Sequence, residues 1–304
     1  MHLICLHSVI PGPIDAFDEK CSRISVAEFE AFLDAVAARF DLVSYSTYAQ
    51  RLRTGGTDDT VALSFDDGFL GVKDHALPVL AARGLDAIAF INPPYLGNPP
   101  DRIFHFLELE IAFRLTAVDR LQLSFADEPL DLTQMKPRVK ALKRVKKLLK
   151  TRPEADRATG HAEVLDRLGV PLEAIHSFAK GDARFQLMAP DGLQVLVAAG
   201  WSIGSHAMSH RTLSMLDDED RWAEIDGARR YFRDQFGWTE MTFAYPYGDH
   251  VHVGDSAPRD VARASHPMAF TTIPGASDLA HAPHRLPRID YKRFLRDYRV
   301  LNAA

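Results

Sequence analysis

Two histidines and two adjacent aspartates are the residues whose types and spacing could do chemistry. His206 and His210 lie four residues apart in "SHAMSH", and Asp66 and Asp67 stand together in "SFDDG". Each pair directly follows a short apolar stretch of the chain. Two imidazoles and one carboxylate can hold a divalent metal and leave a coordination position open for water. The four residues therefore favour a hydrolytic metal site, if the fold brings them together.

Both pairs follow a predicted strand that precedes a predicted helix. In a barrel of such units, the carboxyl ends of the strands share one mouth, which would bring Asp67 to His206 and His210. Spacing by four on one helical turn would place both imidazoles on one face. Adjacent residues at a strand end point different ways, so Asp66 would remain free to act as general base on a metal-bound water. The alternative for the aspartates is a simple Asp-Gly turn.

Short apolar strands alternate with helical patterns along most of the chain. The predicted strands are 3–7, 61–65, 86–92, 201–205, 241–245 and 268–272, and the predicted helices are 26–40, 72–84, 192–200, 219–237 and 258–264. Repeated strand–helix units imply parallel pairing of the strands. The sequence contains no GxGxxG or P-loop pattern, which would have favoured a nucleotide-binding open sheet instead. The fold class predicted is therefore α/β, a barrel of parallel strands. Residues 1–304 are expected to form one domain, with a mostly helical insertion at 98–190 that caps or flanks the active-site face.

The composition excludes few classes of protein, but it excludes some. The 304 residues are 46% apolar and 25% charged. The net charge of −5 does not favour binding to nucleic acid. The two cysteines form no CxxC spacing, which argues against a structural zinc cluster. No signal peptide and no apolar run of transmembrane length is evident, so a cytoplasmic protein is expected.

One segment of the insertion is strongly basic. Residues 136–152, "KPRVKALKRVKKLLKTR", carry nine basic residues and no acidic one, and apolar residues recur at helical spacing. One interpretation is a solvated helix that docks by its apolar stripe. The other is contact with an anionic partner, either phospholipid head groups at a membrane surface or a sugar linked to diphosphate.

Three segments of the sequence resemble, in order and approximate spacing, the signature motifs of the polysaccharide deacetylases, the NodB-homology family. They are "SFDDG", "SHAMSH" and, at 243–248, "FAYPYG". The resemblance covers about 61–92 and 190–290. It implies an irregular (β/α)7 barrel, and removal of acetyl groups from N-acetylated sugars with one divalent metal. That metal is usually zinc, with Co, Ni, Mn and Fe as alternatives.

The resemblance also implies roles for single residues. Asp66 matches the general base of the family, and Asp67, His206 and His210 match the three metal ligands. Tyr247 matches the tyrosine whose backbone N–H helps to hold the oxyanion.

The chain departs from the family pattern at two points. The third motif of the family begins with an arginine that orients the base, and here Ala244 takes its place; Arg288 is the candidate substitute, with Arg285 as the weaker one. The late Leu-x-His motif, which supplies the general acid, is missing. "CLHSV" at 5–9 resembles an opening found in some members, so His7 is expected to be the acid, with His284 and His105 as alternatives.

The sequence thus predicts an N-deacetylase that acts on an acetamido sugar in a polysaccharide, an oligosaccharide, or a lipid- or nucleotide-linked precursor. Two other functions stay open. One is hydrolysis of a non-sugar amide such as a ureide or cyclic imide, and the other is carbohydrate binding by a protein that has lost its activity.

Overall fold

The centre of the molecule is a barrel of parallel strands, seen in a computed structural model that describes residues 1–20, 23–55, 59–99, 102–275, 277, 279–280 and 282–300. Neighbouring strands follow the order β12-β11-β10-β9-β6-β5-β1-β13, and each neighbouring pair is parallel. Their bounds are β1 His2–Leu6, β5 Thr60–Asp66, β6 Ile88–Ile91, β9 Ser202–Ser205, β10 Phe243–Ala244, β11 Ala269–Thr271, β12 Leu286–Pro287 and β13 Ile289–Asp290. The predicted barrel of parallel strands is confirmed.

The two ends of this strand order belong to one segment of the chain. β12 pairs with β11, β13 pairs with β1, and only Arg288 separates β12 from β13. The barrel therefore closes at Arg288, where the segment changes partners. Counted as one, β12 and β13 give the seven strand positions of an irregular (β/α)7 barrel. β4 (Asp41–Leu42) pairs with β5 beside this path.

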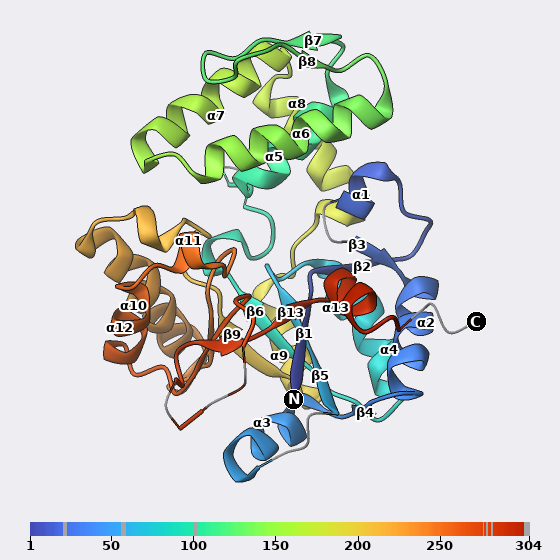
Figure 1. Cartoon of the computed structure of the whole chain (residues 1–304), viewed down its shortest axis with the longest axis vertical. Coiled ribbons are helices and arrows are strands. Elements are labelled where there is room, and N and C mark those ends of the chain that lie inside the picture. Colours follow the sequence, from blue (N-terminus) through green and yellow to red (C-terminus); the bar gives the residue numbers. More distant parts are fainter. Residues whose placement is uncertain are drawn as a thin grey trace.

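Helices follow the strands and cover the outside of the barrel (Figure 1). They are α2 Val26–Ala37, α3 Tyr45–Thr54, α4 Leu77–Ala81, α9 Pro190–Ala198, α10 Asp218–Phe236, α11 His250–Val253, α12 Ala257–Arg263 and α13 Tyr291–Asp297, and a π-helical turn over Val72–Ala76 precedes α4. The amphipathic patterns seen in the sequence account for them: α2, for example, buries Phe29, Phe32, Leu33 and Val36 against the core. Within β9, Gly204 is required, because a Cβ there would lie 2.4 Å from the ring of Phe90.

The predicted insertion is mostly helical, and its helices gather on one side of the barrel (Figure 1). It contains α5 His105–Leu115, α6 Met135–Lys150, α7 Glu154–Leu168, α8 Leu172–Gly181 and the short hairpin of β7 Arg120–Leu121 with β8 Leu130–Asp131. Near it, α1 (Ala16–Lys20), β2 (Ser8–Ile10) and β3 (Arg23–Ser25) form a small N-terminal unit. The apolar stripe expected in the basic segment is buried at Val139, Leu142, Val145 and Leu149.

A buried group of charges fastens the insertion to this N-terminal unit. Arg23 of β3 pairs with Glu110 of α5 at 2.7 Å and with Asp18 of α1 at 3.3 Å, and all three side chains are buried. Arg114 of α5 pairs with the same two carboxylates. Burial would raise the pKa of Glu110, but Arg23 and the cations near it hold that pKa below its usual value.

Replacing Glu110 by Gln is expected to lower the free energy of unfolding by about 3–5 kcal/mol, because it breaks a buried ion pair and leaves Arg23 short of a counter-charge. Urea denaturation measures the change. Glu173→Gln, at an exposed position of α8, is the control and should leave the midpoint nearly unchanged. An equal, small effect of both substitutions would contradict the importance of the buried pair.

Among the residues that the structure describes, no helix combines the length and the apolar character needed to cross a membrane. The location of the protein stays a prediction.

Candidate active site

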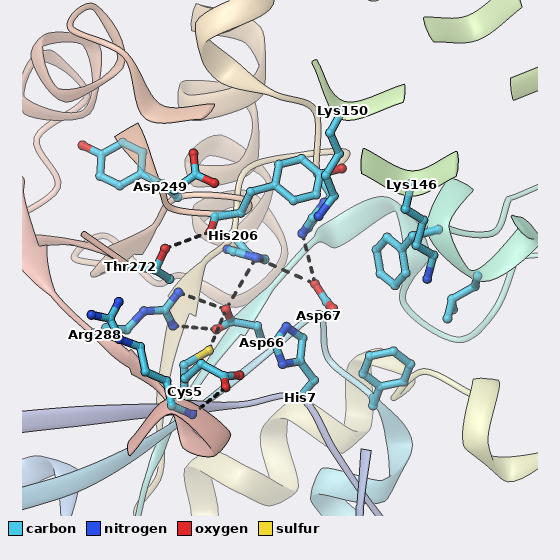
Figure 2. Close-up of a pocket in the computed structure, with 18 of the residues that line it drawn as sticks. Cys5, His7, Asp66, Asp67, Lys146, Lys150, His206, Asp249, Thr272 and Arg288 are labelled. Carbon is cyan, nitrogen blue, oxygen red and sulfur yellow. Dashed lines mark hydrogen bonds and ion pairs between the residues drawn. The ribbon is translucent and has the colours of Figure 1, made fainter. Parts of the chain in front are cut away.

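The two adjacent aspartates lie at the carboxyl end of β5, at the mouth of the barrel. Asp66 is the last residue of the strand, and Asp67 has a φ of 71°, in the left-handed region that non-glycine residues seldom adopt. This turn sends the two side chains in different directions, as expected from their position. Asp66 faces Arg288, and His206 lies between the two carboxylates, with its Nε2 3.7 Å from Oδ2 of Asp66 and 3.7 Å from Oδ1 of Asp67 (Figure 2). Asp67 also faces His210.

Asp66 is held by two donors. The guanidinium of Arg288 donates from Nη1 to Oδ1 at 2.7 Å and from Nη2 to Oδ2 at 2.9 Å, and the thiol of Cys5 donates to Oδ2 at 3.3 Å. Burial would raise the pKa of Asp66, but Arg288, aided by His206, holds it well below its usual range. Asp66 is therefore an ionised carboxylate fixed in one orientation. The structure brings together the aspartate and the arginine that the sequence proposed as a pair.

Three ligand atoms of Asp67, His206 and His210 converge. Nε2 of His206 lies 3.7 Å and Nε2 of His210 lies 3.5 Å from Oδ1 of Asp67, and this oxygen is buried without a hydrogen-bond partner among the described residues. Nδ1 of His206 donates to the carbonyl of Ala244 at 2.7 Å, so its Nε2 carries the lone pair. Ligands about 2.0–2.2 Å from a zinc ion stand at such separations from each other. The three residues fit a divalent cation.

The loop that carries the two histidines is not the helical turn expected from their spacing. After β9 the chain runs through 206–212 without helix, and Ala207 and His210 adopt φ values of 61° and 60°. These two left-handed residues turn the loop back, so the imidazole rings lie 5.0 Å apart. The expectation that His206 and His210 share one face of a helical turn was wrong. Their side chains nevertheless lie close together, as expected.

The protonation of the three converging residues reflects their burial. Burial lowers the pKa of His206 to about 4, and burial, followed by the nearby His206, lowers that of His210 well below its usual value. Burial, followed by the charge of Asp66, raises the pKa of Asp67 well above its usual value. Two neutral imidazoles are the form that binds a metal, and a cation would reverse the shift at Asp67.

Of the three candidate acids, only His7 lies in the pocket. It follows β1 and lines the same cavity as Asp66. Burial lowers its pKa, and the charges of Asp66 and Asp290 oppose that effect. His284 instead contacts the carbonyl of His266, and His105 is 70% exposed on α5. Arg285, the weaker candidate for orienting the base, also lies away from Asp66, where it contacts Gly254 and Asp255.

Tyr247 lies beside the converging histidines. It has a φ of 62°, and its ring centroid is 4.7 Å from that of His210. Tyr247 lines the cavity, and its backbone N–H makes no hydrogen bond to another described residue. Strained backbone at Asp67, Ala207, His210 and Tyr247 concentrates at this mouth, as is common for functional sites.

Two lysines of the insertion complete the cavity, which has a volume of about 500 Å³. Lys146 and Lys150 of α6 line it on the side opposite the barrel (Figure 2). Nζ of Lys150 lies 4.2 Å from the centroid of the Tyr247 ring. Burial, followed by the charge of Lys146, lowers the pKa of Lys150 to about 8. Part of the basic segment therefore faces the candidate site, while Lys143 and Lys147 are exposed.

The sequence did not indicate the two contacts made by Cys5 and Lys150. Cys5 lies on β1, two residues before His7, which directly follows the strand, so a continued strand period would place both on one face, and this signal was available. The sequence marked the basic segment that contains Lys150, but it could not indicate which lysine enters the cavity, since that depends on how the insertion packs on the barrel.

A comparison with protein families gives a match to polysaccharide deacetylase over residues 158–264. This segment contains both converging histidines and "FAYPYG", but it does not reach the aspartates of β5. None of the curated proteins compared matches the chain.

Solved structures of deacetylases share the fold. The deacetylase PplD of Streptococcus pyogenes, determined in complex with acetate, has 13% identity and a TM-score of 0.56, with 97% of this chain and 96% of that chain covered. IcaB from Ammonifex degensii has 16% identity and a TM-score of 0.56, with 97% and 95% covered. A de-N-acetylase from Aggregatibacter actinomycetemcomitans has 13% identity and a TM-score of 0.55, with 99% of both chains covered. The resemblance of this chain to the polysaccharide deacetylases is therefore confirmed, by the family match over residues 158–264 and by a fold shared along nearly its whole length.

Proposed function

We propose that the protein is a metal-dependent hydrolase that removes the N-acetyl group of an acetamido sugar. The observation that carries the proposal is the convergence of the ligand atoms of Asp67, His206 and His210 beside the ionised Asp66–Arg288 pair. Hydrolysis of an unreactive amide needs a metal ion to activate the carbonyl and the water, and a carboxylate to accept a proton from that water.

Asp67, His206 and His210 would hold the cation, and their nitrogen and oxygen donors suit Zn²⁺ first, with Co, Ni, Mn and Fe as alternatives. When bound, such a cation polarises the acetamide carbonyl and lowers the pKa of a water.

The other residues act on protons and charge. Asp66, kept ionised and oriented by Arg288, accepts a proton from the attacking water. The backbone N–H of Tyr247 donates to the oxyanion that develops on the former carbonyl oxygen. His7 delivers a proton to the amine nitrogen as the C–N bond breaks, so the products are acetate and a free amino sugar.

We further propose that the insertion belongs to the catalytic unit and that the sugar carries a phosphate or diphosphate. Lys146 and Lys150 extend from α6 into the cavity that contains Asp66 and Asp67. Two ammonium groups at this cavity, with Nζ of Lys150 beside the Tyr247 ring that packs on His210, suit an anionic group attached to the sugar.

Replacing Lys150 by Ala is expected to raise the KM of a diphosphate-linked acetamido sugar about tenfold to a hundredfold. A charge-assisted hydrogen bond contributes about 1.5–3 kcal/mol, and each ~1.4 kcal/mol is a factor of ten. Steady-state acetate release measures the KM, and the neutral sugar without diphosphate should change little.

Lys147→Ala is the matched control, since Lys147 lies on the same helix but is exposed. Equal effects of both substitutions would contradict a role for Lys150 in the cavity. If instead Lys143→Glu with Lys147→Glu reduces binding to anionic vesicles, and Lys150→Ala leaves the KM unchanged, the basic helix contacts a membrane surface.

The proposed function is tested by acetate release on a panel of substrates, with the metal content measured on the same sample. The panel contains N-acetylated oligosaccharides, the same sugars linked to diphosphate, and cyclic imides and ureides. Acetate from an acetamido sugar is the expected result. Hydrolysis of the cyclic imides or ureides without acetate release would show that the protein is a hydrolase of small amides. No hydrolysis of any substrate would favour a carbohydrate-binding protein without activity.

A further inference from the structure

A second cluster of metal-ligating side chains lies in the insertion, outside the candidate active site. The segment 98–190 contains three histidines, His105, His161 and His176, and each comes from a different helix. All three converge on one carboxylate, Glu108 of α5. Nothing in the proposed hydrolysis uses these residues.

The distances within the cluster are short. Nε2 of His161 lies 3.2 Å from Oε2 of Glu108 and 3.3 Å from the backbone carbonyl of His105. Nδ1 of His105 lies 3.4 Å from the same Oε2, and Nε2 of His176 lies 4.0 Å from Oε1. One ligand atom from each of His105, Glu108 and His161 falls within 4.8 Å of the others. Ligands around one zinc ion, each about 2.0–2.2 Å from it, are separated by similar distances, and small side-chain movements complete the fit.

The local structure favours a cation over a simple ion pair. His105 and Glu108 are three residues apart on the first turn of α5, so they share a face of that helix. The side chains of Glu108 and His161 are only 13% and 12% exposed. The Glu108 carboxylate faces three imidazoles and little water. A neutral imidazole gives it no counter-charge, and only a protonated imidazole supplies one. A bound divalent ion would satisfy His105, Glu108 and His161 together, and His176, which faces the other carboxylate oxygen, would join them after a side-chain movement.

We propose that His105, Glu108, His161 and His176 form a structural site for a divalent cation, with Zn²⁺ as the ion that best suits three imidazoles and one carboxylate. The site joins α5, α7 and α8. Since α5 also supplies Phe106, Leu107 and Glu110 to the wall of the active-site cavity, the cation fixes the helix that forms that wall. The spacing of the cysteines in the sequence could not indicate this site, because none of its four ligands is a cysteine.

The test counts metal ions on untagged protein. The purified chain is stripped with a chelator, titrated with Zn²⁺ and assayed for metal per chain, together with Glu108→Gln, His161→Gln and, in the barrel, His206→Gln. We expect two ions per chain for the wild type, one for each variant, and none when His161→Gln and His206→Gln are combined. His250→Gln, at an exposed histidine outside both clusters, should keep both ions.

His105→Gln guards against loss of metal through misfolding, since a side chain 70% exposed contributes little to packing. It should weaken Zn²⁺ binding at the insertion at least about tenfold, without a change in the melting temperature of the metal-free protein. In the His206→Gln background, Zn²⁺ should raise the melting temperature, and adding His161→Gln should remove that rise.

The outcomes separate this site from the proposed function. If the barrel binds no metal, the wild type holds one ion, which Glu108→Gln loses and His206→Gln keeps. If His206→Gln holds no ion, or if Glu108→Gln and His161→Gln keep the wild-type count, the insertion site does not exist.

Discussion

Acetate release by the Asp66→Asn variant is expected to fall by about 10²–10⁴-fold, while its metal content stays that of the wild type. The substitution keeps the shape of the side chain but removes the carboxylate that would accept the proton of the attacking water. Asp66 borders the group of three converging ligands, since its Oδ2 lies 3.7 Å from Nε2 of His206, but its carboxylate is already bonded to Arg288 and Cys5. Steady-state assays combined with elemental analysis of the same preparation measure both quantities.

Asp249→Asn provides the matched control. Asp249 lines the same cavity, and its side chain accepts hydrogen bonds from the first turn of α11, which an asparagine also accepts. Its activity should stay within a few-fold of the wild type. A fully active Asp66→Asn variant would refute the assignment of the base. A variant that loses its metal would instead place Asp66 among the ligands.

The second large effect is expected from loss of the metal ligands in the barrel. His206→Gln should lower acetate release at least about 10²-fold, because the site loses a ligand that is fixed by its own hydrogen bond to Ala244. Treatment of the wild type with a chelator should have a similar effect, and added Zn²⁺ should restore activity to the wild type at concentrations where the variant stays inactive.

His252→Gln is the control for this prediction. His252 is another largely buried histidine that faces an aspartate, Asp249, but it lies outside the converging group. It should keep both its metal and most of its activity. Undiminished turnover after complete removal of metal, verified by elemental analysis, would exclude the metal-dependent mechanism.

The sequence predicted which side chains lie together where chemistry and strand geometry act together. The placement of Asp66 and Asp67 at a strand end, and of His206 after another strand, follows from parallel strands whose carboxyl ends share one edge. Arg288 was proposed from the resemblance, as a substitute for the arginine that Ala244 replaces, and the structure places it against Asp66. Local sequence was sufficient in these cases, because the strands are short, apolar and bounded by turns.

The sequence failed where the backbone is unusual or where distant segments pack. Spacing by four cannot distinguish a helical turn from a loop with left-handed residues at Ala207 and His210, since both bring the side chains together. The position of Lys150 in the cavity depends on the docking of α6, which the buried pairs of Arg23 and Glu110 help to fix. Such contacts join residues 87 positions apart and leave no periodic signal.

The closure of the barrel at Arg288 has a consequence for the order in which the protein becomes active during its synthesis. The ribosome produces Asp66, Asp67 and both histidines of the loop long before it produces Arg288. A nascent chain that has emerged up to β11 therefore carries the proposed cation ligands, but its Asp66 has no guanidinium to hold it ionised and in place. Closure of the barrel and placement of the guanidinium against Asp66 therefore occur together, when the segment that contains Arg288 pairs with β11 and β1.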